Sequence, residues 1–122
     1  MPTTYHEDDS TGTAEITVSG RVTQDDFDAI ASPLQDFIDR HGTIRLIEVI
    51  ESLTGFDASM IWSGLKFDIR NIPHISHVAV VTDIGWLSPV SRAAGAVISC
   101  KLRTFPMADL DAARDWIRAP DG

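Results

Sequence analysis

The stretch from Thr43 to Phe67 constrains the fold of this chain more than any other part of the sequence. Ile44 to Ile50 is an almost continuous aliphatic run, interrupted by two charged residues. A strand that is apolar on both faces is typical of the centre of a sheet covered by helices on both sides. The polar residues Glu51 to Asp57 then predict a loop, and a helix is expected to begin at Asp57-Ala58-Ser59 with Asp57 as its N-cap.

A hairpin and a helix are predicted before this stretch. Thr3 to Glu7 and Ala14 to Val22 flank a cluster of turn-forming residues, which predicts two antiparallel strands. A helix begins after Thr23 with acidic residues in its first turn, and His41-Gly42 ends it. Pro33 lies inside its apolar pattern, so we expect the helix to bend or split there.

Helices and strands alternate after the central strand. The predicted elements are a helix from Asp57 to about Asn71, a strand over Val78 to Val81, a helix from Ser88-Pro89, a strand over Lys101 to Phe105 and a final helix capped by Asp109. Strands separated by helices imply a mostly parallel sheet, to which the hairpin adds an antiparallel edge. We therefore predict one α/β domain over residues 1–122 with about four helices, a size typical of a single core.

Composition and charge exclude several classes of protein. The formal charge is −8, from 10 basic and 18 acidic side chains, which argues against nucleic acid as a partner because phosphate binding needs a basic surface. Cys100 is the one cysteine, which excludes an internal disulfide, fits a reducing compartment and is expected to be a buried, inert thiol. Met1 to Ser10 is acidic rather than signal-like, and no apolar run has the length of a membrane span. We expect a cytoplasmic protein.

The residues that could carry chemistry do not predict an enzyme. Asp25, Asp26 and Asp28 fan out around a helix start, so we interpret them as a solvated first turn rather than as paired catalytic carboxylates. His74 and His77 have a spacing that a metal could use, but they straddle a loop and a strand without a third ligand, so locally bonded histidines are expected. We predict no catalytic residue, no metal and no cofactor.

Several short motifs occur along the predicted elements in a characteristic order. They are Gly20 with the following helix, Leu46-Ile47-Glu48, Trp62-Ser63-Gly64-Leu65-Lys66, His77-Val78-Ala79-Val80-Val81-Thr82-Asp83, Trp86, Phe105 and Ala112-Ala113-Arg114-Asp115-Trp116-Ile117. Over nearly the whole chain this order resembles the STAS domain and, within it, the SpoIIAA-like family of small bacterial proteins. The resemblance implies a STAS-like α/β fold and a non-catalytic module that binds proteins or small ligands. For the SpoIIAA-like group it further implies a lipid-like ligand, membrane association and a homodimer.

The resemblance also implies a candidate for phosphorylation. In anti-anti-sigma factors, a serine in an Asp-Ser-Ser-Gly motif at this helix start is phosphorylated by a partner kinase. The matching positions here are Asp57-Ala58-Ser59-Met60, so Ser59 keeps the second serine while alanine and methionine replace the other two residues. Ser59 is therefore either a phosphorylation site or a first-turn residue that shares the hydrogen bonds of the helix start.

The helix after the central strand and the segment before the next helix carry more apolar residues than one core face needs. Met60 and Phe67 lie opposite the core stripe with Trp62 between them, and Trp86 and Leu87 lead into the following helix. One interpretation is an ordinary core plus a dimer contact. The other is a pocket between the two helices that admits an acyl chain or another apolar ligand.

Pockets in α/β sheets favour the carboxyl ends of the strands, where Ser52, Thr54 and Asp83 are expected. Lys66 is expected to offer a cationic partner to a membrane surface. The predicted ligand-binding residues are Ser52, Thr54, Met60, Trp62, Lys66, Phe67, Asp83, Trp86 and Leu87. We thus predict a non-enzymatic module that binds an apolar or lipid-like ligand with reversible membrane association. The alternative is a phospho-regulated switch that binds a protein partner through Ser59.

Overall fold

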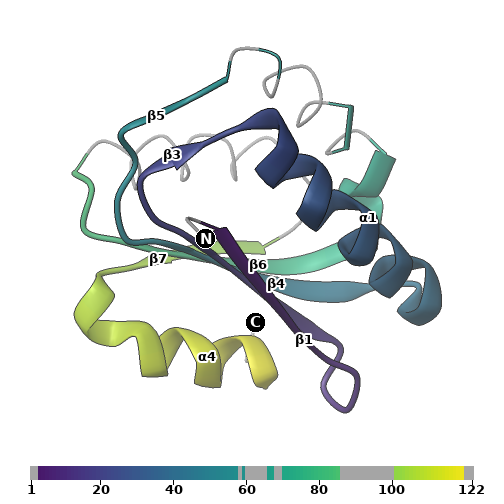
Figure 1. Ribbon diagram of the computed structural model, residues 1–122. Coiled ribbons are helices and arrows are strands. Elements are labelled where there is room, and N and C mark those ends of the chain that lie inside the picture. Colours follow the sequence, from purple (N-terminus) through teal and green to yellow (C-terminus); the bar gives the residue numbers. More distant parts are fainter. Residues whose placement is uncertain (1–2, 58, 60–65, 68–69, 86–100, 120–122) are drawn as a thin grey trace.

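The computed structural model describes residues 3–57, 59, 66–67, 70–85 and 101–119. Within them the main sheet has five strands in the order β1-β2-β4-β6-β7 (Figure 1). Their bounds are β1 Thr3–Asp8, β2 Thr13–Val18, β4 Ile44–Ile50, β6 Ile75–Thr82 and β7 Lys101–Phe105. β1 and β2 are antiparallel, and every other neighbouring pair in this sheet is parallel. The predicted mixed, mostly parallel sheet with an antiparallel hairpin is confirmed.

Strand β4 is the centre of this sheet and is buried on both faces, as its sequence predicts. Leu46 packs into a cluster with α1 (Gln24–His41), whereas Ile47 and Val49 pack into a second cluster with α4 (Leu110–Arg118). Figure 1 shows α1 and α4 on opposite faces of the sheet. The fold therefore has a helix layer on each side of one strand layer.

Helix α1 is closed at both ends by its own sequence. The Thr23 hydroxyl accepts from the Asp26 N–H, and the Asp26 carboxylate accepts from the Thr23 N–H, so the two residues form a capping box. Gly42 ends the helix with a φ of 77°, a conformation that glycine adopts without steric cost. The helix continues through Pro33, so the expected split is wrong. Burial of the apolar stripe on either side of the proline outweighs the one backbone hydrogen bond that it removes.

Strand β2 is shorter than predicted, because the chain leaves the main sheet after Val18. Gly20 has a φ of 87°, which turns the backbone away from the ladder. Arg21–Val22 (β3) then pairs in parallel with Gly55–Phe56 (β5), forming a separate two-stranded sheet. The prediction of one strand from Ala14 to Val22 is therefore wrong, and the expected loop after β4 contains β5.

The second half of the chain follows the predicted order with shifted bounds. Strand β6 is longer at both ends than the predicted strand from Val78 to Val81, whereas β7 has the bounds expected from the sequence. Short 3₁₀ helices, Ile72–His74 and Met107–Asp109, precede β6 and α4. Asp109 occupies the N-cap position of α4 without a side-chain hydrogen bond, so its predicted capping role is wrong. The 3₁₀ turn before α4 is instead held by a residue from another part of the chain, because the Met107 N–H donates a hydrogen bond to Asp83 Oδ1 at 2.9 Å.

Two of the predicted helices lie wholly or largely outside the described residues. The helix expected from Ser88-Pro89 and the neighbouring Cys100 are outside them. In the helix expected from Asp57 to Asn71, the structure describes Asp57, which is not helical, and Ser59, 66–67 and 70–71, which are helical.

Candidate functional site

An apolar cavity of about 200 Å³ lies between α1 and the sheet. Side chains of β2, β4 and α1 form most of its wall, and Phe67 adds one side from the following helical segment. The described residues that line it are Thr3, Ile16, Val18, Val22, Asp26, Phe27, Ile30, Ala31, Leu34, Leu46, Glu48, Phe67 and Ile75. Ligand sites in proteins are typically concave and apolar with a few polar groups, and this lining has that composition.

The cavity exists because the two halves of α1 pack differently against the sheet. Phe37 and Ile38, toward the end of the helix, are almost completely buried in the core. Phe27, Ile30 and Ala31, toward its start, are only half-buried and line the cavity. The apolar stripe of α1 therefore serves as core at one end and as the wall of the cavity at the other.

A polar contact fixes Phe67 beside α1. Asn71 is fully buried, and its Nδ2 donates to Gln35 Oε1 of α1 at 2.8 Å and to the Phe67 carbonyl at 2.9 Å. The Phe67 ring meets the Phe27 ring edge-on, with centroids 6.3 Å apart and an interplanar angle of 87°. One amide thus connects the helical segment around Phe67 to α1, and two aromatic rings border the cavity between them.

Three polar residues interrupt the apolar lining. Thr3 is 7% exposed, and its Oγ1 is buried without a hydrogen-bond partner. Asp26 comes from the first turn of α1, and Glu48 comes from the central strand. That oxygen has almost no accessible surface, so a molecule in the cavity would not reach it, and the two carboxylate residues supply the charge of the described lining.

Asp57 connects the segment that precedes Ser59 to the start of α1. Its Oδ2 accepts from the Gln24 N–H at 2.9 Å, and its Oδ1 accepts from the Arg21 guanidinium at 2.6 Å. These two contacts, the backbone N–H first and the guanidinium second, hold the pKa of the Asp57 carboxyl below its usual range. Asp57 therefore supplies an extra acceptor to the N-terminus of α1, and its capping of the next helix stays a prediction. Ser59 itself is exposed.

The polar residues expected at the carboxyl ends of the strands connect chain segments at that edge. Ser52 Oγ accepts from the Gly20 N–H at 2.8 Å, and the Thr54 N–H donates to the Gly20 carbonyl at 3.0 Å. Asp83 bonds the Met107 N–H, as described above, and Lys66 is exposed. None of these four is among the described residues that line the cavity, so their binding role stays a prediction.

Four of the predicted ligand-binding residues are not described by the structure. They are Met60, Trp62, Trp86 and Leu87. The pocket predicted between the two helices that carry them consequently stays a prediction, and Phe67 is the member of the predicted set that the structure places in a cavity wall.

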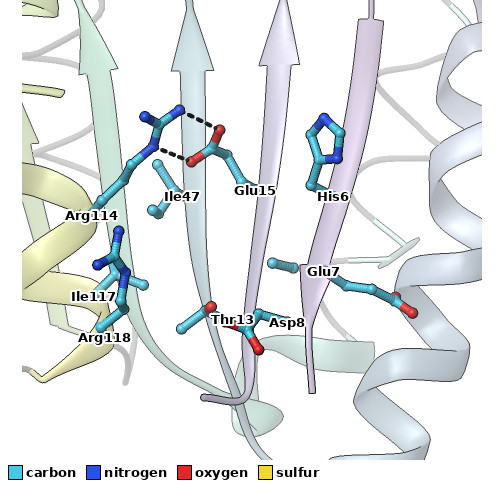
Figure 2. A pocket seen from close by; sticks show the side chains of 10 residues that line it. His6, Glu7, Asp8, Thr13, Glu15, Ile47, Arg114, Ile117 and Arg118 are labelled. Carbon is cyan, nitrogen blue, oxygen red and sulfur yellow. Dashed lines mark hydrogen bonds and ion pairs between the residues drawn. The ribbon is translucent and has the colours of Figure 1, made fainter. Parts of the chain in front are cut away.

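A second hollow, of about 320 Å³, lies on the opposite face of the sheet beside α4 (Figure 2). There Arg114 of α4 donates from Nε and Nη2 to the two carboxylate oxygens of Glu15 on β2, at 2.8 and 2.9 Å. The Arg114 hydrogen bond lowers the pKa of Glu15, and that same contact raises the pKa of Arg114. His6, Asp8 and Arg118 also line this hollow, whereas the Glu7 carboxylate points away from it and pairs with Arg40 of α1 at 3.1 Å (Figure 2). This hollow mainly contains the ion pair that attaches α4 to the hairpin.

The two histidines with metal-like spacing make separate local contacts. His74 Nδ1 lies 3.0 Å from the Gly42 carbonyl oxygen, and the His77 ring packs edge-on against Trp116 at 5.5 Å between centroids. Within the described part of the chain, no group of three or more His, Cys, Asp or Glu side chains could hold a metal ion.

Comparison with known proteins shows the family of this chain. A family model described as SpoIIAA-like matches residues 13–118. The chain belongs to the SpoIIAA-like family. No curated protein matches it. Its structure is similar to the crystal structure of an uncharacterised protein from the DUF3478 family, with a SpoIIAA-like fold, from Shewanella loihica PV-4, at a TM-score of 0.76 and 18% identity over 94% of this chain and 91% of that one.

Across the residues that the structure describes, no helix combines the length and the apolar character needed to cross a bilayer.

By sequence alone, much of the cavity wall has the pattern of ordinary core. Ile16 and Val18 alternate with polar residues as in any half-buried strand, and Phe27 and Ile30 continue the core stripe of α1. The sequence signal that could distinguish these wall residues from core is position: Phe27 and Ile30 lie near the start of α1, and Val18 lies where the chain passes from β2 to β3. The sequence carries no signal for the roles of Thr3 and Asn71 at this site, because neither residue belongs to a motif.

The Glu15–Arg114 pair predicts a pH-dependent contribution to stability. Because the pKa of Glu15 in the folded protein lies below its ordinary value of 4.5, the contribution is present above about pH 4.5 and is lost as the pH falls through the folded pKa. Glu15→Gln should lower the free energy of unfolding by about 1 kcal/mol at pH 7 and by much less at pH 2.5, as measured by urea denaturation. The exposed Glu51→Gln is the matched control and should have no such effect. An equal loss at both pH values would contradict the role of the ion pair.

Proposed function

We propose that this protein is a non-enzymatic binding module whose ligand is a small apolar or lipid-like molecule in the cavity between α1 and the sheet. The observation that carries the proposal is the apolar lining of that cavity, contributed by α1, β2, β4 and Phe67. Protein cores are close-packed and contain few voids larger than a water molecule, so a hollow of this size in an apolar layer is unusual. A dry engineered cavity of about 150 Å³ already binds benzene.

Access to the cavity supports binding rather than a sealed packing defect. Val18, Phe27 and Ile30 line the cavity and are half-buried, so their apolar surface remains in contact with water. Removing such surface from water contributes roughly 25 cal/mol per Å². A ligand that covered these side chains would gain that free energy without requiring the sheet to move.

A cavity-filling substitution tests this function. Ala31→Leu on α1 should fill part of the cavity and weaken toluene binding at least tenfold in a ¹H–¹⁵N NMR titration, because the added side chain takes the place of the probe. Ala29→Leu is the matched control, since Ala29 is exposed on the same helix and does not line the cavity, and it should bind toluene as the unaltered protein does. Equal affinities of the two variants would contradict the proposed site.

Native mass spectrometry of freshly purified protein should show a co-purified apolar molecule.

Reversible membrane association is the second part of the proposal. Its support is the apolar excess in the sequence at Met60, Trp62, Trp86 and Leu87, together with the exposed Lys66 beside Phe67. With a formal charge of −8, the protein should prefer neutral membranes. In liposome flotation we expect more protein on phosphatidylcholine vesicles than on phosphatidylserine-rich ones, and less of the Trp86→Ala variant on either. Absence of the unaltered protein from both floated fractions would contradict membrane association.

A phospho-regulated interaction through Ser59 is the alternative function. Its support is that Ser59 is exposed and lies two residues after Asp57, which contacts the N-terminus of α1. A charge at Ser59 would therefore act close to the start of the helix that forms the cavity wall. Ser59→Asp should change the set of proteins retained from a cell lysate, with Ser59→Ala as the control. Identical sets for the two variants would count against the switch.

A further inference from the structure

We infer that the cavity between α1 and the sheet selects neutral or cationic amphiphiles with one short apolar chain or ring and rejects anionic ones such as fatty-acid carboxylates. This inference rests on the proposed function and names the class of its ligand. It is carried by two observations: the volume of the cavity and the sign of the charges on the described residues that line it.

The volume limits the apolar part of the ligand. At about 200 Å³ the cavity is slightly larger than one that accepts benzene and smaller than the roughly 300 Å³ at which pockets for drug-sized ligands begin. One ring or one short alkyl chain fits this space, whereas the paired chains of a membrane phospholipid do not.

The charged residues in the wall are of one sign. Among the described residues that line the cavity, the charged ones are Asp26 and Glu48, and none is lysine, arginine or histidine. Asp26 is fixed in the first turn of α1, where its carboxylate accepts from the Thr23 N–H at 2.9 Å. At an effective dielectric constant of about 20, like charges roughly 10 Å apart repel enough to weaken binding on the order of tenfold. A carboxylate head therefore meets repulsion that an alcohol avoids and an amine reverses.

Three probes of equal chain length test the inference. Octylamine, 1-octanol and octanoate, each below its micelle concentration, are titrated into the ¹⁵N-labelled protein at pH 7 and followed by NMR. We expect octylamine and 1-octanol to shift amides of the cavity wall and octanoate to bind at least tenfold more weakly than 1-octanol. Octanoate binding as tightly as 1-octanol would overturn the inference and leave the proposed function standing. Failure of all three probes to bind would overturn both.

One pair of variants assigns the selectivity to a residue. Asp26→Asn removes the charge and keeps an amide oxygen for the Thr23 N–H, so the preference for 1-octanol over octanoate should fall at least threefold. Asp28→Asn, in the same turn but not among the lining residues, should leave the preference as it is. An unchanged preference in Asp26→Asn would overturn the role of Asp26 in the selection.

Discussion

Burial of the central strand on both faces is the constraint on which the rest of the structure depends. Ile44 and Leu46 face the cluster beneath α1, whereas Ile47 and Val49 face the cluster beneath α4. Full burial of each such side chain contributes roughly 1.5–3 kcal/mol, so exposure of either face would cost a large share of a small domain's net stability. A helix layer is consequently required on each face of β4 to keep the strand buried. The polar contacts fix the position of these layers.

The cavity is a consequence of how α1 is held over that strand. Its C-terminal half is fixed by apolar packing, and its N-terminal half is fixed by backbone N–H groups that donate to the side chains of Thr23, Asp26 and Asp57. Asn71 then connects the segment around Phe67 to the middle of the same helix. Hydrogen bonds set the position of the N-terminal half without filling the space beneath it, and the start of α1 therefore borders a cavity instead of continuing the core.

The two faces of the sheet differ in electrostatic character as well as in packing. On the face covered by α4, a bidentate Arg114–Glu15 pair lies beside a hollow of mixed charge, and its main effect is to attach the last helix to the first hairpin. On the face covered by α1, the hollow is apolar and its charged wall residues are acidic among those described. The first arrangement stabilises the fold, and the second supports the proposal of an apolar ligand with a neutral or cationic head.

The sequence by itself determined the double burial of β4, the hairpin, the ends of α1 and the order of the elements, because periodicity, capping residues and turn formers are local signals. It also contained the motifs that place the chain in the SpoIIAA-like family. Only the tertiary structure decided that β2 stops at Val18, that α1 continues through Pro33, and that Thr3, Phe27 and Phe67 line one cavity. The reason is physical: whether an apolar side chain is core or cavity wall depends on the distance to the element opposite it. That distance is set by contacts between residues far apart in the chain, on which a local pattern carries no information.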